Sequence, residues 1–348
     1  MKTGLLTFHC AQSYGAVLQA FALKRYLQSL GHEVTFINYR PDSLVRKKIS
    51  PGNIINYFLF RRFEKKWLVP QTKAFKAKSE IDDSILRFDA YIVGSDQVWN
   101  LDFSENSELT YFFDFIPDHK LKISYAASFG KSELEIPKDK KVEIQLQLQE
   151  FKAISIREKS GLSILDSIFK LQGEQSIDPT FLLKEDNYRE YFEIKEQQIK
   201  KQMLCFKFLK DGYFFETVQQ IKRIYGIQIL VVGKPQLVKG IRFVSYPSPS
   251  RWLKLFYQSE YVFTDSFHGL AFAIIFKKKF IVTPANVKRF TRIKDLLDVL
   301  GLGNRIYYQY ENILKSNAWL QDIDYSIVEK KLNALREKST SFLNNNLL

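Results

Sequence analysis

Short apolar runs alternate with amphipathic stretches along the chain, which is typical of an α/β protein. Leu5 to Phe8 is apolar, and after a polar loop the next stretch carries apolar side chains at helical spacing until Gly31. A second apolar run, Val34 to Tyr39, follows at once. This order of strand, helix and strand predicts a parallel sheet with helices on both faces.

The alternation pauses at a charged stretch and then restarts. Before it, further strands are expected at Tyr91 to Val93, Lys122 to Ala126, Ala153 to Arg157 and Ser176 to Ile177. After it, strands are expected at Met203 to Phe208, Ile227 to Val232, Tyr261 to Phe263 and Phe280 to Val282. Helices are expected at Gly212 to Tyr225, Ser250 to Gln258, Gly269 to Phe276, Thr291 to Leu300 and about Tyr325 to Phe342.

The pattern therefore predicts two doubly wound, Rossmann-like domains that face one cleft. The expected boundaries are 1–184 for the first domain, 185–201 for a linker and 202–348 for the second. The last helix is expected to pack back on the first domain. Because ligands of such sheets bind at the carboxyl ends of the strands, the loops after strands are the places to look for chemistry.

Composition excludes several classes of protein. With 45% hydrophobic and 26% charged residues, the chain can bury a core, which a disordered chain cannot. Cys10 and Cys205 lie in no CxxC or Cys/His cluster, so no metal site or disulfide framework is indicated. The first apolar stretch is too short for a signal peptide, and no apolar run approaches the roughly 20 residues of a membrane span. We expect a cytoplasmic protein.

Positive charge is concentrated in one segment of the chain. The net charge is +14, and residues 44–78 contain ten basic residues against the single acid Glu64, interleaved with aromatic residues. Such a segment is typical of a stretch that lies at an anionic membrane surface. The alternative is a solvated basic face over a packed aromatic stripe. Nucleic acid is disfavoured as a partner because no nucleic-acid-binding motif accompanies the charge.

Two loops of the first half carry polar residues suited to sugar hydroxyls. Ser13 and Tyr14 lie where a strand leads into a helix N-terminus, although an ordinary turn with a Ser13 cap is the alternative. The run Gly94 to Asn100 offers hydrogen-bonding groups and an apolar ring for a sugar, from Ser95, Asp96, Gln97 and Trp99. In the alternative interpretation, Asp96 caps a helix and Trp99 belongs to the core.

Two further positions point to an anionic ligand or to proton transfer. Arg157 ends an apolar strand, so it either pairs with Glu158 or another carboxylate, or binds an anionic ligand. His268 lies between the polar turn with Asp265 and Ser266 and an apolar helix, which favours a catalytic role over a structural one. A helix N-terminus disfavours the imidazolium, so Asp265 or an anionic substrate has to offset this effect.

Six ordered blocks of the sequence resemble the polysaccharide pyruvyl transferase family, over about Lys2 to Arg305. The blocks are Tyr14 to Ala20, Gly94 to Asn100, Ser124 to Gly130, Ser155 to Glu158, Asp178 to Thr180 and Thr264 to Gly269. The resemblance implies two Rossmann-like domains in a GT-B-like arrangement. It also implies transfer of pyruvate from phosphoenolpyruvate to a sugar of a surface or capsular polysaccharide precursor, giving a ketal and phosphate in exopolysaccharide biosynthesis.

The resemblance also assigns roles to residues. His268 matches the family's histidine and is the expected acid, while Arg157 matches the arginine that contacts the donor. Arg292 matches a further basic position, and Arg289 nearby is the alternative. Ser266 and Asp265 complete the expected donor site. The expected acceptor residues are Ser13, Tyr14, Ser95, Asp96, Gln97 and Trp99, and Ser13 replaces the asparagine usual in relatives.

The chemistry of phosphoenolpyruvate agrees with these roles. A small, highly anionic enol ester needs fixed cations, and ketal formation needs an acid that protonates its methylene carbon. No cofactor or metal is expected, since phosphoenolpyruvate is a co-substrate. The acceptor is expected to be a lipid-linked sugar or an oligosaccharide. The alternatives are a GT-B glycosyltransferase that uses a nucleotide sugar, and a non-catalytic basic module that binds glycan or membrane.

Overall fold

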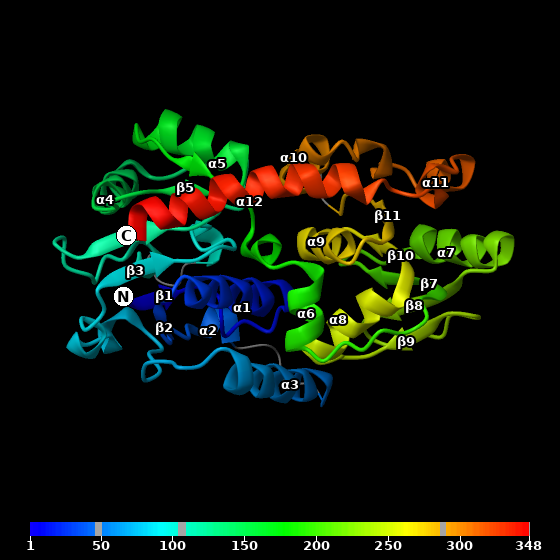
Figure 1. Ribbon diagram of the computed structural model, residues 1–348, viewed down its shortest axis with the longest axis horizontal. Helices are drawn as coiled ribbons and strands as arrows, with labels where there is room; N and C mark the ends of the chain where they lie inside the picture. The colour runs from blue at the N-terminus through cyan, green and yellow to red at the C-terminus, as the bar shows by residue number, and fades with distance from the viewer. Residues whose placement is uncertain (46–50, 104–108, 286–289, 348) are drawn as a thin grey trace. The chain divides into compact units, whose positions relative to one another are not determined.

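The protein is described by a computed structural model that covers residues 1–45, 51–103, 109–285 and 290–347 (Figure 1). The chain forms two compact units. The first consists of Met1–Asn53, Phe60–Leu183 and Asn333–Leu348, and the second of Ile54–Leu59 and Lys184–Leu332. Each unit has its own parallel sheet and its own core.

The first unit is built on a parallel sheet in the order β2-β1-β3-β4. Its strands are β1 (Lys2–Leu6), β2 (Glu33–Phe36), β3 (Ala90–Val93) and β4 (Leu121–Ser124). Single bridges from Ile123 to Ala153 and from Ala127 to Ile156 continue the sheet towards the short pair β5 (Ser155–Ile156) and β6 (Glu174–Gln175). Its helices are α1 (Tyr14–Ser29), α2 (Asp42–Val45), α4 (Lys138–Gln149) and α5 (Lys159–Ile164), with parts of α3 (Pro51–Trp67) and α12 (Tyr325–Leu347).

The second unit has a parallel sheet in the order β11-β10-β7-β8-β9. Its strands are β7 (Lys200–Phe206), β8 (Gln228–Val232), β9 (Arg242–Val244), β10 (Ser259–Thr264) and β11 (Lys279–Val282). Its helices are α6 (Glu185–Tyr191), α7 (Gly212–Tyr225), α8 (Pro249–Gln258), α9 (Phe267–Ile275), α10 (Thr291–Leu300) and α11 (Glu311–Lys315), with the start of α12.

The apolar runs become central strands because both faces of each sheet are covered. All four residues of β3 are buried, and Met203, Leu204 and Cys205 of β7 are fully buried. The cores are rich in aromatic rings that pack edge to face, such as Trp252 against Phe206 and Phe272. These rigid sheets fix the loops at their carboxyl ends, where the candidate residues lie.

The α/β fold with parallel sheets is confirmed, and several elements differ in detail from the sequence pattern. β6 lies two residues before the predicted strand at Ser176, and β5 is shorter than predicted. The pattern missed α4 because this helix is largely polar, with only Ile144 and Leu148 buried, and it missed β9 because this strand has only three residues, none of them buried. Residues 185–201 hold α6 and the start of β7. The second half of α12 packs within the first unit, where Ser339 accepts a hydrogen bond from the backbone of Ile177.

No helix among the described residues is both long enough and apolar enough to cross a membrane.

Candidate functional site

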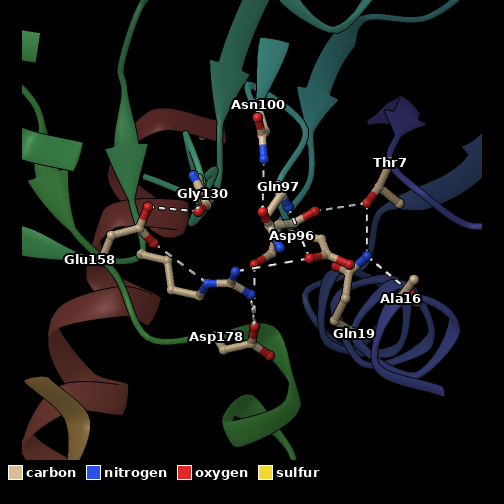
Figure 2. Close-up of polar contacts among 12 residues, drawn as sticks. Thr7, Ala16, Gln19, Asp96, Gln97, Asn100, Gly130, Glu158 and Asp178 are labelled. Carbon is tan, nitrogen blue, oxygen red and sulfur yellow. Dashed lines mark hydrogen bonds and ion pairs between the residues drawn. The ribbon is translucent and has the colours of Figure 1, made fainter. Parts of the chain in front are cut away.

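Five of the six sequence blocks meet at the carboxyl ends of the first sheet (Figure 2). The loops after β3, β4 and β5 contribute Ser95, Ser128 and Arg157, and Asp178 precedes a short turn of helix (Pro179–Leu182). The first block joins through α1, where Gln19 donates to the hydroxyl of Thr7 at 2.8 Å. Because parallel strands end at one edge, residues far apart in the sequence are neighbours here.

Arg157 is the centre of this cluster and is paired with carboxylates. Its side chain is 2% exposed, and Nη1 donates to Asp178 at 2.7 Å. Glu158 lies 3.7 Å from Nε, and Asp96 lies 3.9 Å from Nη2. Burial opposes the charge of Arg157, but the three carboxylates outweigh it and raise the pKa of the guanidinium. The sequence left two alternatives for Arg157, pairing with carboxylates or binding an anionic ligand. The structure shows the first.

Further hydrogen bonds hold the carboxylates of Asp178 and Glu158 in place (Figure 2). Asp178 accepts from the backbone N–H of Thr180 at 3.0 Å and from its hydroxyl at 2.8 Å. Glu158 accepts from the hydroxyl of Ser128 at 2.6 Å, and this hydroxyl accepts from the N–H of Gly130. The cluster is therefore a cross-linked framework in which each charged group has several partners.

Of the four predicted acceptor residues of this loop, two are partly exposed and two are enclosed. Asp96 and Gln97 are half-buried, and Asp96 has a backbone φ of 79°, which is rare for a residue with a side chain. Gln97 accepts from Asn100 at 2.9 Å. Ser95 is fully buried, and its hydroxyl donates to Asp178 at 3.4 Å. Asp96 and Gln97 are therefore partly accessible, whereas Ser95 belongs to the framework.

Trp99 does not have the predicted sugar-stacking role in this structure. Its side chain is fully buried and stacks on Phe112, with ring centroids 5.3 Å apart. Its Nε1 donates to the backbone oxygen of Tyr111 at 2.9 Å. A ring enclosed on both faces cannot meet a sugar. The alternative interpretation, a core residue, describes Trp99.

The first loop has an exposed end at Ser13. Ser13 occupies the N-cap position of α1, but its side chain makes no capping hydrogen bond and is exposed. Tyr14 is half-buried, and its ring lies 5.1 Å from that of Phe60. Tyr14 thus packs as the alternative interpretation has it, and Ser13 remains accessible to a ligand.

In the second unit, His268 is the second residue of α9, directly after the end of β10. Ser266 caps the helix and accepts from the N–H of Gly269 at 3.3 Å. A side chain at Gly269 would place a Cβ only 2.3 Å from the hydroxyl oxygen of Thr264, so glycine is needed there. His268 is half-buried beside Phe267. The predicted position of His268 at a helix N-terminus is confirmed.

A buried lysine that the sequence analysis missed lies in the same unit. Lys207 follows β7, and its Nζ is 3.3 Å from the carboxylate of Asp265, with both side chains at most 1% exposed. Lys207 also donates to the hydroxyl of Thr283, which follows β11. Asp265 accepts from the N–H groups of Phe208 at 2.7 Å and Leu209 at 3.0 Å. These contacts occupy both oxygens of the Asp265 carboxylate.

Lys210 adds a second amine to this cluster. Its Nζ donates to the backbone oxygen of Lys207. Burial lowers the pKa of both Lys207 and Lys210, and Asp265 offsets this only in part. Two amines and one carboxylate thus gather at the ends of three neighbouring strands, β11, β10 and β7. An anion fits such a site.

Arg292 is half-buried in the first turn of α10, a helix that packs against α9. Arg289 lies outside the described residues. Among the described residues, no group of three or more His, Cys, Asp or Glu is arranged to hold a metal ion.

The sheets and the residues at their ends define a two-unit α/β protein with a GT-B-like fold. Its fold resembles a UDP-GlcNAc 2-epimerase from Neisseria meningitidis, with 12% identity and a TM-score of 0.55 over 100% of this chain and 99% of that one. A putative UDP-N-acetylglucosamine 2-epimerase from Listeria monocytogenes is 11% identical, with a TM-score of 0.56 over 94% of this chain and 90% of that one. A UDP-glucosyltransferase from Polygonum tinctorium is 10% identical, with a TM-score of 0.50 over 97% of this chain and 94% of that one. No curated protein matches the sequence.

The sequence comparison narrows this class to one family. The family model described as polysaccharide pyruvyl transferase matches residues 14–284, which is most of the chain. The protein belongs to the polysaccharide pyruvyl transferase family. The family indicates a transferase that acts on a saccharide.

Proposed function

We propose that the protein transfers pyruvate from phosphoenolpyruvate to a sugar of a surface or capsular polysaccharide precursor, forming a ketal and releasing phosphate. The observation that carries the proposal is the second-unit cluster. His268 lies in the first turn of α9, which follows β10, and Lys207 and Lys210 follow the neighbouring strand β7. The family match supports the pyruvyl group as the one transferred.

Phosphoenolpyruvate carries a phosphate and a carboxylate, so its site needs several positive groups. In this proposal Lys210 and Arg292 supply direct contacts, together with the N–H groups at the start of α9, and the enclosed Lys207 adds its positive charge from behind the site. Ser266 orients that helix start, and Asp265 holds Lys207 in place. Arg157 contacts the donor only if the donor displaces one of the carboxylates that Arg157 already binds.

The reaction uses His268 first as an acid and then as a base. The imidazolium gives its proton to the methylene carbon, which leaves C2 as an electrophilic, oxocarbenium-like centre. A sugar hydroxyl adds to C2, and its proton returns to His268. The C2–O bond to phosphate then breaks, which makes C2 electrophilic again. A second hydroxyl adds to C2, and the released phosphate, still in the site, accepts its proton. On the acceptor side we propose Ser13, Asp96 and Gln97, whose side chains are at least partly accessible.

The test combines a variant with a choice of donors. His268→Asn should lower phosphate release from phosphoenolpyruvate and acceptor by about 10²-fold or more, the usual contribution of a general acid. Thermal stabilisation by phosphoenolpyruvate should persist, because His268 is not its main charge partner. His119→Asn, which changes an exposed histidine, is the matched control and should be fully active.

Two results would overturn the proposal. Stabilisation of the wild-type protein by a uridine or guanosine diphosphate sugar but not by phosphoenolpyruvate would favour a glycosyltransferase, in line with the nucleotide sugars named for the structural neighbours. If no donor is turned over and His268→Asn leaves all glycan or membrane binding intact, the protein is a binding module.

We also propose that helix α3 attaches the enzyme to an anionic membrane surface that carries a lipid-linked acceptor. Ile55 and Phe58 are 54% and 65% exposed, and the cations Arg62, Lys65 and Lys66 are exposed further along the helix. Arg46, Lys47 and Lys48 of the predicted basic segment lie outside the described residues. An exposed helix face with apolar and basic residues favours contact with a bilayer.

Vesicle binding tests this attachment. The triple variant Arg62→Gln, Lys65→Gln and Lys66→Gln should bind vesicles with phosphatidylglycerol about tenfold or more weakly, because each basic residue contributes about 1 kcal/mol at such a surface. Arg61 is left unchanged because it pairs with Glu64 at 2.7 Å. The control carries the same charge change at three other exposed lysines of the first unit, Lys138, Lys159 and Lys170. Equal binding by both triple variants would contradict the proposal.

A further inference from the structure

A basic hollow lies on one face of the second sheet, along β7, β8, β9 and the neighbouring helix α8. Its volume is about 430 Å³, within the usual range for small-molecule sites. Four cations line it, namely Lys200, Arg242, Arg251 and Lys254, and no acidic residue does. None of its lining residues belongs to the proposed donor or acceptor site.

Strand register and helix spacing bring these residues together. Leu230 of β8 is paired with Arg242 of β9, and Val244 follows two positions after Arg242, so all three side chains share one face of the sheet. On α8, Arg251, Lys254 and Gln258 are spaced three and four residues apart and therefore share one side of the helix. Leu230 and Leu255 are buried apolar residues of the same hollow.

Arg242 is held in position by a buried amide. Gln202 is 3% exposed, and its Oε1 accepts from Nη2 of Arg242 at 3.3 Å. The other end of this amide, Nε2, donates to the hydroxyl of Ser259 at 2.9 Å, and this hydroxyl donates to the backbone oxygen of Leu255 at 2.7 Å. The relay joins β7, β10 and α8, so the guanidinium is anchored to the fold although Arg242 itself is exposed.

The lining of the hollow contains no carboxylate that could balance its four positive charges. Among the described residues, none of its four cations is within ion-pair distance of a carboxylate, in contrast to Arg61, Arg157 and Lys207. Concave surfaces lined by one sign of charge raise the local concentration of the opposite ion. Two arginines offer planar forks for phosphate oxygens, and two lysines add point charges.

We propose that this hollow binds the diphosphate group of a small organic ligand, with the apolar residues beneath it contacting the organic part. Four positive charges match the charge of a diphosphate better than that of a monoanion. This chemistry occurs in soluble nucleoside diphosphates and in isoprenoid diphosphates. The site is separate from the one that the proposed pyruvyl transfer uses.

Calorimetric titration of the full-length protein tests the site with three probes: inorganic pyrophosphate, uridine diphosphate and geranylgeranyl diphosphate below its critical micelle concentration. The double variant Arg242→Glu and Lys254→Glu should weaken binding of the best probe at least tenfold. The matched control, Arg223→Glu with Lys330→Glu, changes the net charge equally at two exposed positions of the same unit and should bind as the wild-type protein does. Thermal unfolding of both variants shows whether they fold.

The results of these titrations identify the source of the ligand and show whether the proposal holds. Tighter binding of uridine diphosphate indicates a nucleotide site, and tighter binding of geranylgeranyl diphosphate indicates a lipid-linked ligand. Equal weakening in the two double variants, or no binding of any probe to the wild-type protein, would overturn the proposal.

A second measurement distinguishes this hollow from the donor site. His268→Asn should bind the probes as the wild-type protein does, and phosphoenolpyruvate should not displace them. If phosphoenolpyruvate competes with the probes, they occupy the donor site, and the proposal for the hollow falls while the pyruvyl transfer stands. If the probes bind at the hollow but phosphoenolpyruvate is never turned over, only the proposed function falls.

Discussion

Both units collect charged side chains at the carboxyl ends of their strands, but the two clusters are balanced in opposite ways. In the first unit, the single cation Arg157 faces three carboxylates, of which Asp178 is the closest at 2.7 Å. In the second unit, Lys207 and Lys210 are accompanied by the single carboxylate of Asp265. One cluster has an excess of negative charge, and the other has an excess of positive charge.

This difference supports a framework role for the first cluster and the proposed anion binding for the second. The charge of Arg157 is satisfied inside the protein, and its partners join the loops after three strands, so its removal would leave several buried carboxylates without a counterion. The amines of the second cluster are only partly compensated, which favours an incoming anion. The sequence left Arg157 open between a carboxylate pair and an anionic ligand, and it favoured a catalytic role for His268. The charge balance of the two clusters supports different roles for these residues.

The largest effect on stability is expected from Arg157→Met. Methionine fills much of the space but leaves Asp178 and Glu158 buried with no cation, so the free energy of unfolding should fall by about 3–5 kcal/mol. The difference in free energy of unfolding between this variant and the wild-type protein should become smaller as the pH falls. The reason is that the buried carboxylates of the folded variant bind protons more readily than those of the unfolded chain. Urea denaturation at several pH values measures both effects.

Arg223→Met is the control for this prediction, because Arg223 is exposed on α7. It should change the free energy of unfolding by no more than about 0.5 kcal/mol. The framework role is contradicted if Arg157→Met is as stable as the wild-type protein and loses only its affinity for phosphoenolpyruvate. In that case Arg157 is a donor contact, as the family resemblance implies.

The sequence predicted which loops meet, but not how their charges pair. Apolar runs mark the strands, and parallel strands end at one edge, so the approach of Asp96, Arg157 and Asp178 follows from the order of elements. Which carboxylate Arg157 contacts depends on ångström-scale geometry, which residue spacing does not contain. For the same reason, the enclosure of Trp99 by Phe112 and Tyr111 was open at the sequence level.

Lys207 was missed because the predicted strand was drawn two residues too long. The run Met203 to Phe208 looks like one apolar strand with a lysine inside it, whereas β7 ends at Phe206. With that boundary, Lys207 is the first residue after a strand, which is where ligand contacts are sought. A lysine within an apolar run is a signal that a strand has ended, because the interior of a sheet disfavours its charge.

The pH dependence of donor affinity gives the smaller but sharper test of the second cluster. Burial lowers the pKa of Lys207 below its ordinary value of 10.5, so its amine loses its proton earlier than an exposed lysine does. The affinity for phosphoenolpyruvate should therefore fall with rising pH before pH 10.5 is reached. Titration calorimetry across the alkaline range measures this limb. Lys207→Arg, which stays charged, should make the decline smaller and leave only the part that Lys210 contributes, since burial lowers the pKa of Lys210 as well.

Stability should move in the opposite direction over the same pH range. Between the lowered pKa of folded Lys207 and 10.5, the unfolded chain holds more protons at this position than the folded protein does. The contribution of Lys207 to the free energy of unfolding therefore rises with pH there. A loss of donor affinity without a loss of stability would identify deprotonation in the site rather than alkaline unfolding. If Lys207→Arg shows the same decline in affinity as the wild-type protein, the charge of Lys207 does not contribute to donor binding, and the positive charge must come from Lys210 or Arg292.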